Sequence, residues 1–259
     1  MRKTFRYKNN YNYWLDRWDK IGVDESMVNK NAYPLKFAHQ LIENDKNNYI
    51  LEAGCGNGRL LRYYHERNFK IVGIDFIRVA VDKIKKADNS IKVIQGDIFD
   101  TPFPDQKFKY VLAFGLYHNI ENDVKRALVE TNRIMTKGGL ICASFRADNI
   151  QNRIIDLLYI RRFRGDKSKK YFHKSNYKKS ELKKLFESAS FSISKIETSI
   201  NMPFLFKFKI LRGKNFFNEE DGRKNGYRLN FFGALINSFL MKYLPDQFCN
   251  LYIVYGEKA

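Results

Sequence analysis

The feature that most restricts the fold is an alternation of short apolar runs and helical patterns between residues 49 and 145. The runs are rich in β-branched residues, and the stretches between them carry apolar residues at helical spacing. Strands that alternate with helices in this way build β-α-β units and a parallel sheet. The pattern predicts strands at 49–53, 70–75, 91–94, 110–113 and 139–144, and helices near 59–67, 79–87 and 124–135.

The predicted helix that follows the fourth strand should end at Lys137, Gly138 and Gly139. Basic residues favour the carbonyl end of a helix, and glycine commonly stops one. After residue 145 the pattern loosens, and we expect one more helix near 179–188 and strands at 192–198 and 250–255.

The predicted organisation has a core between two less regular segments. Residues 1–44 supply Trp14, Trp18 and a helical pattern at 35–42, and the stretch from 200 to 246 mixes aromatic with basic residues. We expect the two segments to form one cap over the carboxyl ends of the strands. The expected units are an N-terminal cap and lead helix (1–44), the core (45–199), a cap insertion (200–247) and the final core strand (248–259).

Composition limits the classes of protein and partner. The 259 residues suit one large domain, and the net charge of +19 favours anionic partners. The most apolar stretch, 231–244, is too short to span a bilayer and residues 1–10 resemble no signal peptide, so we expect a cytoplasmic protein. Three scattered cysteines, Cys55, Cys142 and Cys249, predict reduced thiols and no thiolate metal site.

The first predicted strand runs into a glycine-rich loop, ILEAGCGNG at 50–58. Gly54, Gly56 and Gly58 permit positive φ and let a ligand approach the backbone. Their spacing differs from the G-x-G-x-x-G of dinucleotide folds. The acid Glu52 would repel a pyrophosphate, whereas it suits a cationic amino-acid group. The loop therefore favours a ligand that carries such a group.

Two more acids stand at the ends of predicted strands. Asp75 closes IVGID and can accept hydrogen bonds from both hydroxyls of a ribose, and Asp97 can accept one from the amine of an adenine. Phe76 and Ile98 follow these acids directly and could sandwich the ring. Because parallel strands present their carboxyl ends along one edge, we expect one nucleoside site there.

These motifs, with YVLA at 110–113 and RIMTKGG at 133–139, resemble class I methyltransferases over about residues 45–198. The resemblance implies an α/β, Rossmann-like, three-layer αβα fold with a seven-stranded, mostly parallel sheet and a helical, aromatic cap. The implied strand order is 3-2-1-4-5-7-6, with the seventh strand antiparallel. It implies S-adenosyl-L-methionine as cofactor and no metal. The implied cofactor-binding residues are Glu52, Gly54, Gly56, Gly58, Asp75, Phe76, Asp97, Ile98 and Phe114.

The loop after the fourth predicted strand, FGLYHN at 114–119, lies where the family places groups that contact the methyl acceptor. His118 is the candidate general base, since its ordinary pKa is near working pH. Packing alone is the open alternative for His118. His173 could reach the same cleft. The remaining acceptor-side candidates are Tyr117 as a catalytic residue, and Arg146, Trp14 and Asn119 for substrate binding.

The acceptor is predicted to be a small anion, favoured by the charge and by Arg161, Arg162 and Arg164. Segments at 16–22, 145–149 and 245–250 are similar to methyltransferases of bacterial surface-polysaccharide gene clusters. That similarity implies O-methylation of a capsule polysaccharide precursor, such as a sugar, a nucleotide-sugar or a phosphate- or phosphoramidate-bearing molecule. An RNA methyltransferase, a noncatalytic partner protein and peripheral membrane contact through 231–244 remain alternatives, and the oligomeric state is open.

Overall fold

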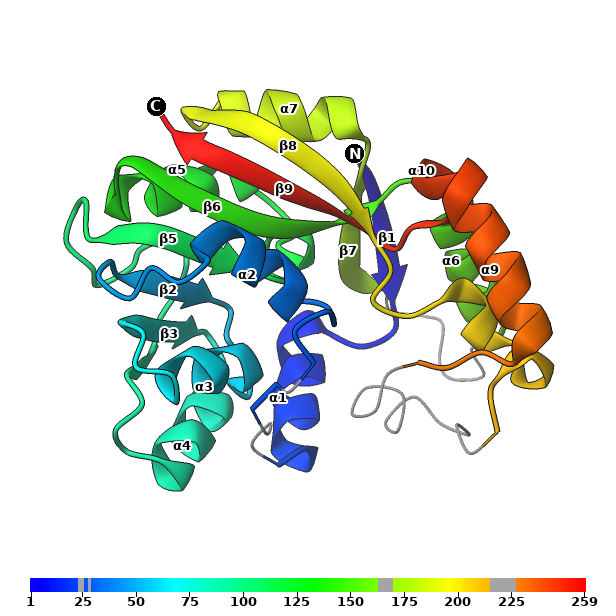
Figure 1. The fold of residues 1–259 in the computed structure, drawn as a ribbon, viewed down its shortest axis with the longest axis horizontal. Coiled ribbons are helices and arrows are strands. Elements are labelled where there is room, and N and C mark those ends of the chain that lie inside the picture. The colour runs from blue at the N-terminus through cyan, green and yellow to red at the C-terminus, as the bar shows by residue number, and fades with distance from the viewer. Residues whose placement is uncertain (23–25, 28, 163–169, 215–226) are drawn as a thin grey trace.

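The computed structural model describes residues 1–22, 26–27, 29–162, 170–214 and 227–259, with the side chains of 159–162 excepted. Its centre is a twisted, mostly parallel sheet (Figure 1). The core strands lie in the order β4-β3-β2-β5-β6-β9-β8, and β9 is antiparallel to β6 and β8. The predicted order 3-2-1-4-5-7-6 is therefore confirmed. The bounds are β2 Ile50–Ala53, β3 Ile71–Asp75, β4 Val93–Gln95, β5 Phe108–Ala113, β6 Met135–Ala147, β8 Phe191–Ser199 and β9 Leu251–Lys258.

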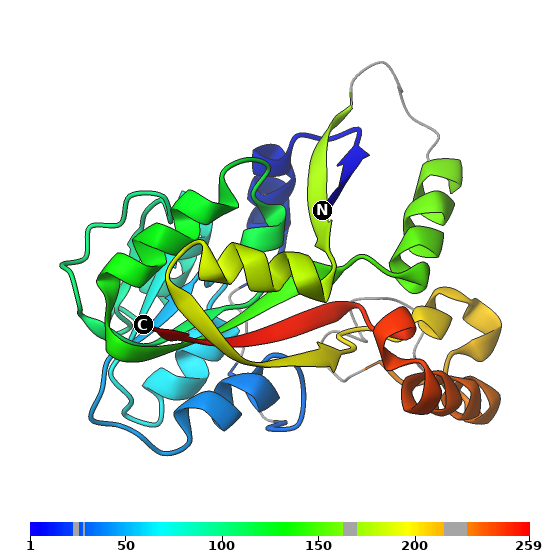
Figure 2. The same ribbon diagram turned by 90° about the horizontal axis from the view of Figure 1, so that it is seen from above.

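Helices cover both faces of the sheet and complete the predicted three layers (Figure 2). Helices α2, α3 and α4 pack their apolar residues on one face, and α5 and α7 pack on the other. Two separate buried clusters result, one on each side of the strands. The bounds are α2 Leu35–Ile42, α3 Arg59–His65, α4 Arg78–Ala87, α5 Val124–Ile134 and α7 Lys179–Glu187.

Helix α5 ends earlier than we expected, so the prediction for Lys137, Gly138 and Gly139 is wrong. Met135 already has extended backbone angles, and these residues belong to β6. The last carbonyls of the helix find other partners. The backbone amides of Gln106 and Lys107 donate to Arg133 and Ile134, and the Lys258 ammonium donates to Asn132 and Met135. Because tertiary contacts satisfy these carbonyls, no glycine cap is needed.

Two strands were not predicted, β1 (Arg2–Arg6) and β7 (Tyr171–Tyr177). They pair antiparallel, and β7 also joins the last residues of β6 in parallel, beyond the end of β5. Figure 1 shows β1 beside β7 at this end of the sheet. The N-terminal segment is thus partly sheet and not only cap. Residue 173 has no partner in β1, so β7 carries a bulge at that point.

The expected cap consists of separate parts that border one space. Helix α1 (Asn10–Lys20) covers the glycine-rich loop. At the other end, α10 (Pro245–Phe248) contacts both α6 (Ile150–Arg162) and α9 (Phe231–Tyr243) (Figure 1). Short 3-10 turns, η2 (Phe204–Lys207) and η3 (Lys209–Leu211), complete the late insertion.

Helix α9 leaves most of its large apolar side chains exposed within this chain. Phe231 is 76% exposed, and Phe232, Leu235 and Phe239 are more than half exposed. Packing within the cap therefore does not cover the helix. Burial against a second copy and contact with a membrane surface stay predictions. Among the described residues, no helix has the length and hydropathy of a membrane span.

Candidate functional site

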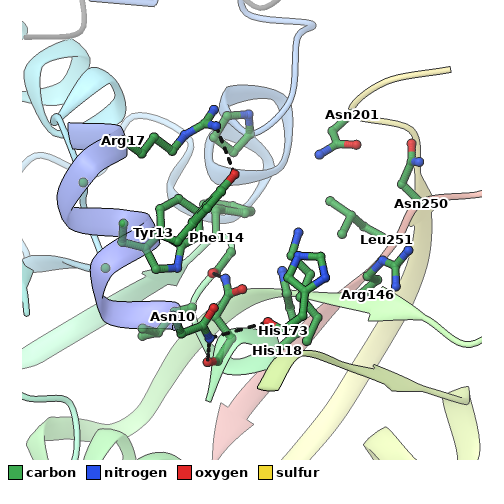
Figure 3. A pocket seen from close by; sticks show the side chains of 18 of the residues that line it. Asn10, Tyr13, Arg17, Phe114, His118, Arg146, His173, Asn201, Asn250 and Leu251 are labelled. Atoms are coloured by element: carbon green, nitrogen blue, oxygen red, sulfur yellow. Dashed lines mark hydrogen bonds between the residues drawn. The ribbon is translucent and has the colours of Figure 1, made fainter. Parts of the chain in front are cut away.

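A large cavity opens at the carboxyl ends of β2, β3, β4 and β5. Its volume is about 1630 Å³, and helix α1, strand β7 and the late insertion also border it. Figure 3 shows side chains from α1, from the loop after β5 and from β6 and β7 around this space. Ligands of α/β sheets bind outside the carboxyl ends of the strands, so the position agrees with the sequence prediction.

The glycine-rich loop forms the floor of the cavity. Gly54, Gly56 and Gly58 have φ values of 72°, 54° and 80°, in the left-handed region that the sequence predicted. A Cβ atom on Gly56 would lie 2.7 Å from Cζ2 of Trp18. Both the backbone angle and the close approach of α1 therefore require glycine at position 56. Glu52 is buried at the end of β2 and lines the same cavity.

Asp75 links the ends of β2 and β3. Its carboxylate accepts hydrogen bonds from the backbone amides of Gly56 at 2.7 Å and Ile77 at 2.9 Å. Burial raises the pKa of this carboxyl, and the two amides oppose that shift. Each carboxylate oxygen can still accept further hydrogen bonds, and the residue lines the cavity. The arrangement fits the predicted role towards ribose hydroxyls.

The predicted adenine-side residues lie at the next strand ends. Asp97 is exposed, and one oxygen accepts from the Phe99 amide at 3.0 Å. Phe76 is 53% exposed and meets Tyr11 edge-on, whereas Ile98 is buried at the cavity wall. One acceptor oxygen and an apolar wall are thus available for an aminated ring. The group of acids, glycines and apolar residues fits the predicted cofactor.

Phe114 and Trp14 also line this cavity. Phe114 packs edge-on against Tyr33, and Trp14 stacks on Trp18 with ring centroids 5.5 Å apart. The aromatic residues thus form part of the wall between the cofactor side and α1. Their positions agree with the predicted binding roles, which stay predictions.

The sequence analysis missed the contacts that seat α1 over the glycine-rich loop. The Lys83 ammonium donates to three carbonyls at the end of α1, those of Trp18, Asp19 and Ile21, at 2.6–3.1 Å. The Asn57 amide donates to Gly22 at 2.7 Å. A cation at a helix carboxyl end is favourable. The amphipathic pattern of α4 gave no sign that its lysine serves another helix.

His118 lies in the 3-10 turn η1 (Tyr117–Asn119) and borders the cavity. Its Nδ1 atom is 3.2 Å from the Ser144 carbonyl, which can only accept, so the ring proton belongs on Nδ1. Burial and the Lys174 ammonium lower the pKa of His118 to about 3. The imidazole is therefore neutral near pH 7. Such a weak base is poorly matched to the predicted general-base role.

Tyr117 does not face the acceptor, so its predicted catalytic role needs correction. The side chain is fully buried in the core, stacks on Phe145 and exchanges a hydrogen bond of 2.7 Å with the Thr131 hydroxyl. Burial raises the pKa of its phenol. In the turn η1, Tyr117 points into the sheet layer while His118 and Asn119 line the cavity.

We expect Tyr117→Phe to leave turnover within about twofold of wild type and to lower the free energy of unfolding by about 1 kcal/mol, the usual worth of one hydrogen bond. The physical reason is that only the bond to Thr131 is lost. Chemical denaturation and a methyl-transfer assay check the two effects. A tenfold loss of turnover without loss of stability would return Tyr117 to the acceptor site.

Arg146 is also not the free anion partner that the sequence suggested. Its guanidinium makes a two-pronged ion pair with Asp156, at 3.0 and 2.7 Å, and donates to Asn176 at 2.6 Å. Arg2 donates to the same Asp156 at 2.9 Å. The Arg146 guanidinium is therefore already paired with an acid of α6. The sequence alone could not show this pairing. The cluster Arg161, Arg162 and Arg164 lies outside the described side chains.

His173 reaches the cavity, as predicted, and so does its neighbour Lys174, which the sequence analysis missed. Successive residues of a strand normally face opposite sides. The bulge at residue 173 breaks this alternation and explains how both can border one space. Burial, followed by the charge of Lys174, lowers the pKa of His173 to about 2. Burial, followed by the charge of Arg146, lowers the pKa of Lys174 to about 7.

Asn119 borders the cavity beside these residues and has acceptor capacity to spare. Its amide nitrogen donates to Gly115, and its backbone carbonyl accepts from Asn10 at 3.0 Å (Figure 3). Its buried Oδ1 has no hydrogen-bond partner among the residues that the structure describes. This atom suits a donor group on a bound molecule, in line with the predicted substrate contact.

Comparison with known proteins agrees with this geometry. Residues 51–143 match the family "Methyltransferase domain". A curated relative, the demethylmenaquinone methyltransferase of Staphylococcus carnosus, is 41% identical over 76 residues, which are 27% of this chain and 30% of the relative. The chain thus spans less than half the length of that relative. The similarity to methyltransferases of surface-polysaccharide clusters gains no support from these findings.

Solved structures share the fold over nearly the whole chain. A complex of the Haloferax volcanii Trm112 methyltransferase activator with a methyltransferase has a TM-score of 0.60 at 13% identity and covers 97% of this chain and 99% of its own. The magnesium protoporphyrin IX methyltransferase of Synechocystis, with bound SAH, has a TM-score of 0.58 at 12% identity and covers 96% of each chain. Residues 51–143 are thus similar to a methyltransferase domain, and the fold of the chain is one that solved methyltransferases share.

Proposed function

We propose that this chain, whose residues 51–143 match a methyltransferase domain, transfers a methyl group from S-adenosylmethionine to a small anionic acceptor. One observation carries the proposal. The same cavity is bordered by the acids Glu52, Asp75 and Asp97 at the strand ends and by the cations Arg17 and Lys174 on the opposite elements. The acids suit a cationic, nucleoside-bearing cofactor, and the cations suit an acceptor of opposite charge.

The strand ends would hold the cofactor by separate contacts. Glu52 would attract its ammonium group, Asp75 would accept from the ribose hydroxyls, and Asp97 would accept from the adenine amine, with Phe76 and Ile98 against the ring. When bound, the cofactor supplies a methyl group on a positively charged sulfur. The residues of the chain then need to hold the acceptor in line and to exclude water.

His118 would orient the acceptor rather than remove its proton. The pKa of His118 is lowered to about 3 by burial, so the ring is a neutral hydrogen-bond acceptor through Nε2. A hydroxyl of the acceptor could donate to this atom, and Asn119 Oδ1 could take a second donor. An acceptor oxygen that is already anionic needs no base. We therefore favour O-methylation, with positioning as the main contribution of the side chains.

The anionic class includes sugar, nucleotide-sugar and phosphate- or phosphoramidate-bearing precursors of capsules or surface glycans, which we retain as candidates. The relatives in the comparison act on other acceptors, as their names state: demethylmenaquinone, malonyl-[acyl-carrier protein] and magnesium protoporphyrin IX. The common chemistry of our candidates is a carboxylate or phosphate group that the cations of the cavity can bind.

Two measurements test the proposal. Calorimetry should detect S-adenosylhomocysteine binding to the purified protein, because the strand-end acids and the glycine-rich loop border the same cavity. Labelled S-adenosylmethionine should then pass its methyl group to members of a panel of phosphorylated, carboxylated and nucleotide-activated metabolites. Absence of S-adenosylhomocysteine binding would overturn the enzyme assignment. Methylation of total RNA with none in the panel would instead favour an RNA methyltransferase, the alternative that the net charge of +19 suggests.

A further inference from the structure

Lys174 sits among more positive than negative groups. It projects from β7 into the cavity, and the groups around it belong to several different helices and strands at this end of the sheet. The charged and titratable groups that act on Lys174 or are acted on by it are Arg6 of β1, Arg17 of α1, His118 of η1, Arg146 of β6, Asp156 of α6 and His173 of β7. Asp156 is the one acid in this set.

That acid is already committed to other cations. Asp156 accepts two hydrogen bonds from Arg146 and one from Arg2. Asp148 pairs with Arg2 and with Arg153. Among the described residues, no carboxylate lies within ion-pair distance of Lys174 or Arg17. Arg17 donates to the Tyr13 hydroxyl at 3.3 Å (Figure 3) and lies over the rings of Trp14 and Trp18, and these three partners are uncharged. Two cations that border the cavity therefore have no counter-charge from this part of the chain.

The pairing of β1 with β7 fixes the backbone position of Lys174. Thr4 of β1 lies opposite Lys174, and its hydroxyl donates to the Lys174 carbonyl at 3.1 Å. The adjacent bulge at His173 redirects the side chains, so that both residues border the cavity. Bulges commonly re-aim side chains beside functional sites. The pairing of β1 with β7 thus brings these cations close together.

We propose that Lys174 and Arg17 form an anion subsite that binds a phosphate or other doubly charged oxyanion of the acceptor, and that Lys174 takes up a proton when the anion arrives. As a statement about the acceptor this rests on the function proposed above, whereas the subsite itself can be tested without cofactor or methyl transfer. Arginine supplies a planar fork, and the lysine ammonium supplies a mobile point charge.

The proton uptake follows from the electrostatics of the cluster. Burial, Arg146 and Arg6 lower the pKa of Lys174 to about 7, so near neutral pH part of the population is uncharged. A bound dianion favours the ammonium form and raises that pKa. Above pH 7 the free protein must therefore gain a proton to bind. The affinity for the anion should fall by up to about tenfold per pH unit, the limit for one linked proton.

Sulfate is the probe, because it stays doubly charged and exchanges no proton between pH 6 and pH 9. The two tryptophans of the chain, Trp14 and Trp18, both border the cavity, so their fluorescence reports binding. Titrations use protein without cofactor, at constant ionic strength. For wild type we expect the dissociation constant to rise at least tenfold from pH 6 to pH 9.

Three variants decide the result. Lys174→Met should weaken sulfate binding at pH 6 by about 10- to 100-fold, the worth of one charge-assisted hydrogen bond, and should remove the pH dependence. Lys125→Met makes the same charge change at an exposed position of α5 outside the cavity and should behave as wild type. Lys174→Arg should bind at pH 6 and lose the pH dependence, because arginine stays charged.

Wild-type pH dependence in Lys174→Met or in Lys174→Arg would overturn the subsite, as would equal weakening in Lys125→Met. A titration of each variant with S-adenosylhomocysteine serves as the separate test of folding and of the proposed function. If the methionine variant fails to bind it, the arginine variant alone decides. If wild type binds sulfate as expected and fails to bind S-adenosylhomocysteine, the subsite stands and the proposed function falls.

Discussion

Replacing Asp156 by alanine is expected to lower the free energy of unfolding by about 3–5 kcal/mol, the usual cost of removing one partner of a buried ion pair. The side chains of Asp156 and Arg146 are only 14% and 10% exposed. Without the acid, the Arg146 guanidinium keeps its place beside Lys174 and Arg2 with no counter-charge, and the hydrogen bonds at 2.7, 2.9 and 3.0 Å are lost. Urea denaturation at pH 7 measures the loss.

The double variant Asp156→Ala, Arg146→Met separates pairing from packing. Removing the stranded guanidinium should restore part of the lost stability, so the double variant should be more stable than Asp156→Ala alone. The single variant Asp148→Ala offers a comparison, because Asp148 pairs with Arg2 and Arg153 but not with Arg146. If Asp156→Ala costs less than 1 kcal/mol, Arg146 is not held as an ion pair and its predicted role in binding the acceptor regains support.

Replacing Asp75 by alanine is expected to weaken S-adenosylhomocysteine binding by roughly 10- to 150-fold, equivalent to about 1.5–3 kcal/mol for a charge-assisted hydrogen bond. The carboxylate also accepts from the Gly56 and Ile77 amides, which position the glycine-rich loop. Alanine leaves both amides without this partner, so the loop keeps only its backbone hydrogen bonds from Gly54 and Cys55 to the Ile74 carbonyl of β3. Calorimetry with the purified variant measures the affinity.

Asp82→Ala is the matched control for this variant. Asp82 lies on the exposed side of α4, where it pairs with Arg78, and it makes the same change in net charge. Its affinity for S-adenosylhomocysteine should equal that of wild type, since a surface ion pair contributes little. Circular dichroism should show that both variants keep the fold. Unchanged affinity in Asp75→Ala would mean that the ribose contact lies elsewhere on the strand edge.

The parallel sheet and the cofactor side of the cavity follow from local sequence patterns, whereas the strand order was implied by the resemblance to class I methyltransferases. Strands β2, β3 and β4 end at or beside a glycine or an acid, and because these strands are parallel, their carboxyl ends lie along one edge. Glu52, Asp75 and Asp97 therefore had to lie near each other once the alternation was recognised. The three glycines of the loop were predictable for the same reason, since positive φ is a property of the residue itself.

The acceptor side depended on contacts between distant parts of the chain. Tyr117 and His118 are neighbours in one short turn, yet the first enters the core and the second borders the cavity, because the direction of each side chain depends on the turn geometry. The pKa of His118 depends on burial and on Lys174, neither of which the sequence displays. The ordinary pKa of histidine, on which the predicted role as a base depended, therefore does not apply to this buried ring.

The sequence by itself determined the parallel sheet and the acids at its edge, because those features repeat within short, local units, and the resemblance to class I methyltransferases supplied the strand order. Only the tertiary structure decided that strand Arg2–Arg6 pairs with strand Tyr171–Tyr177, that Asp156 forms an ion pair with Arg146, and that Lys174 borders the cavity. Antiparallel pairing between strands so far apart in the chain leaves no periodic signal in either segment. The charge balance of a cavity is likewise a sum over every element that borders it, and that sum exists only once the chain has folded.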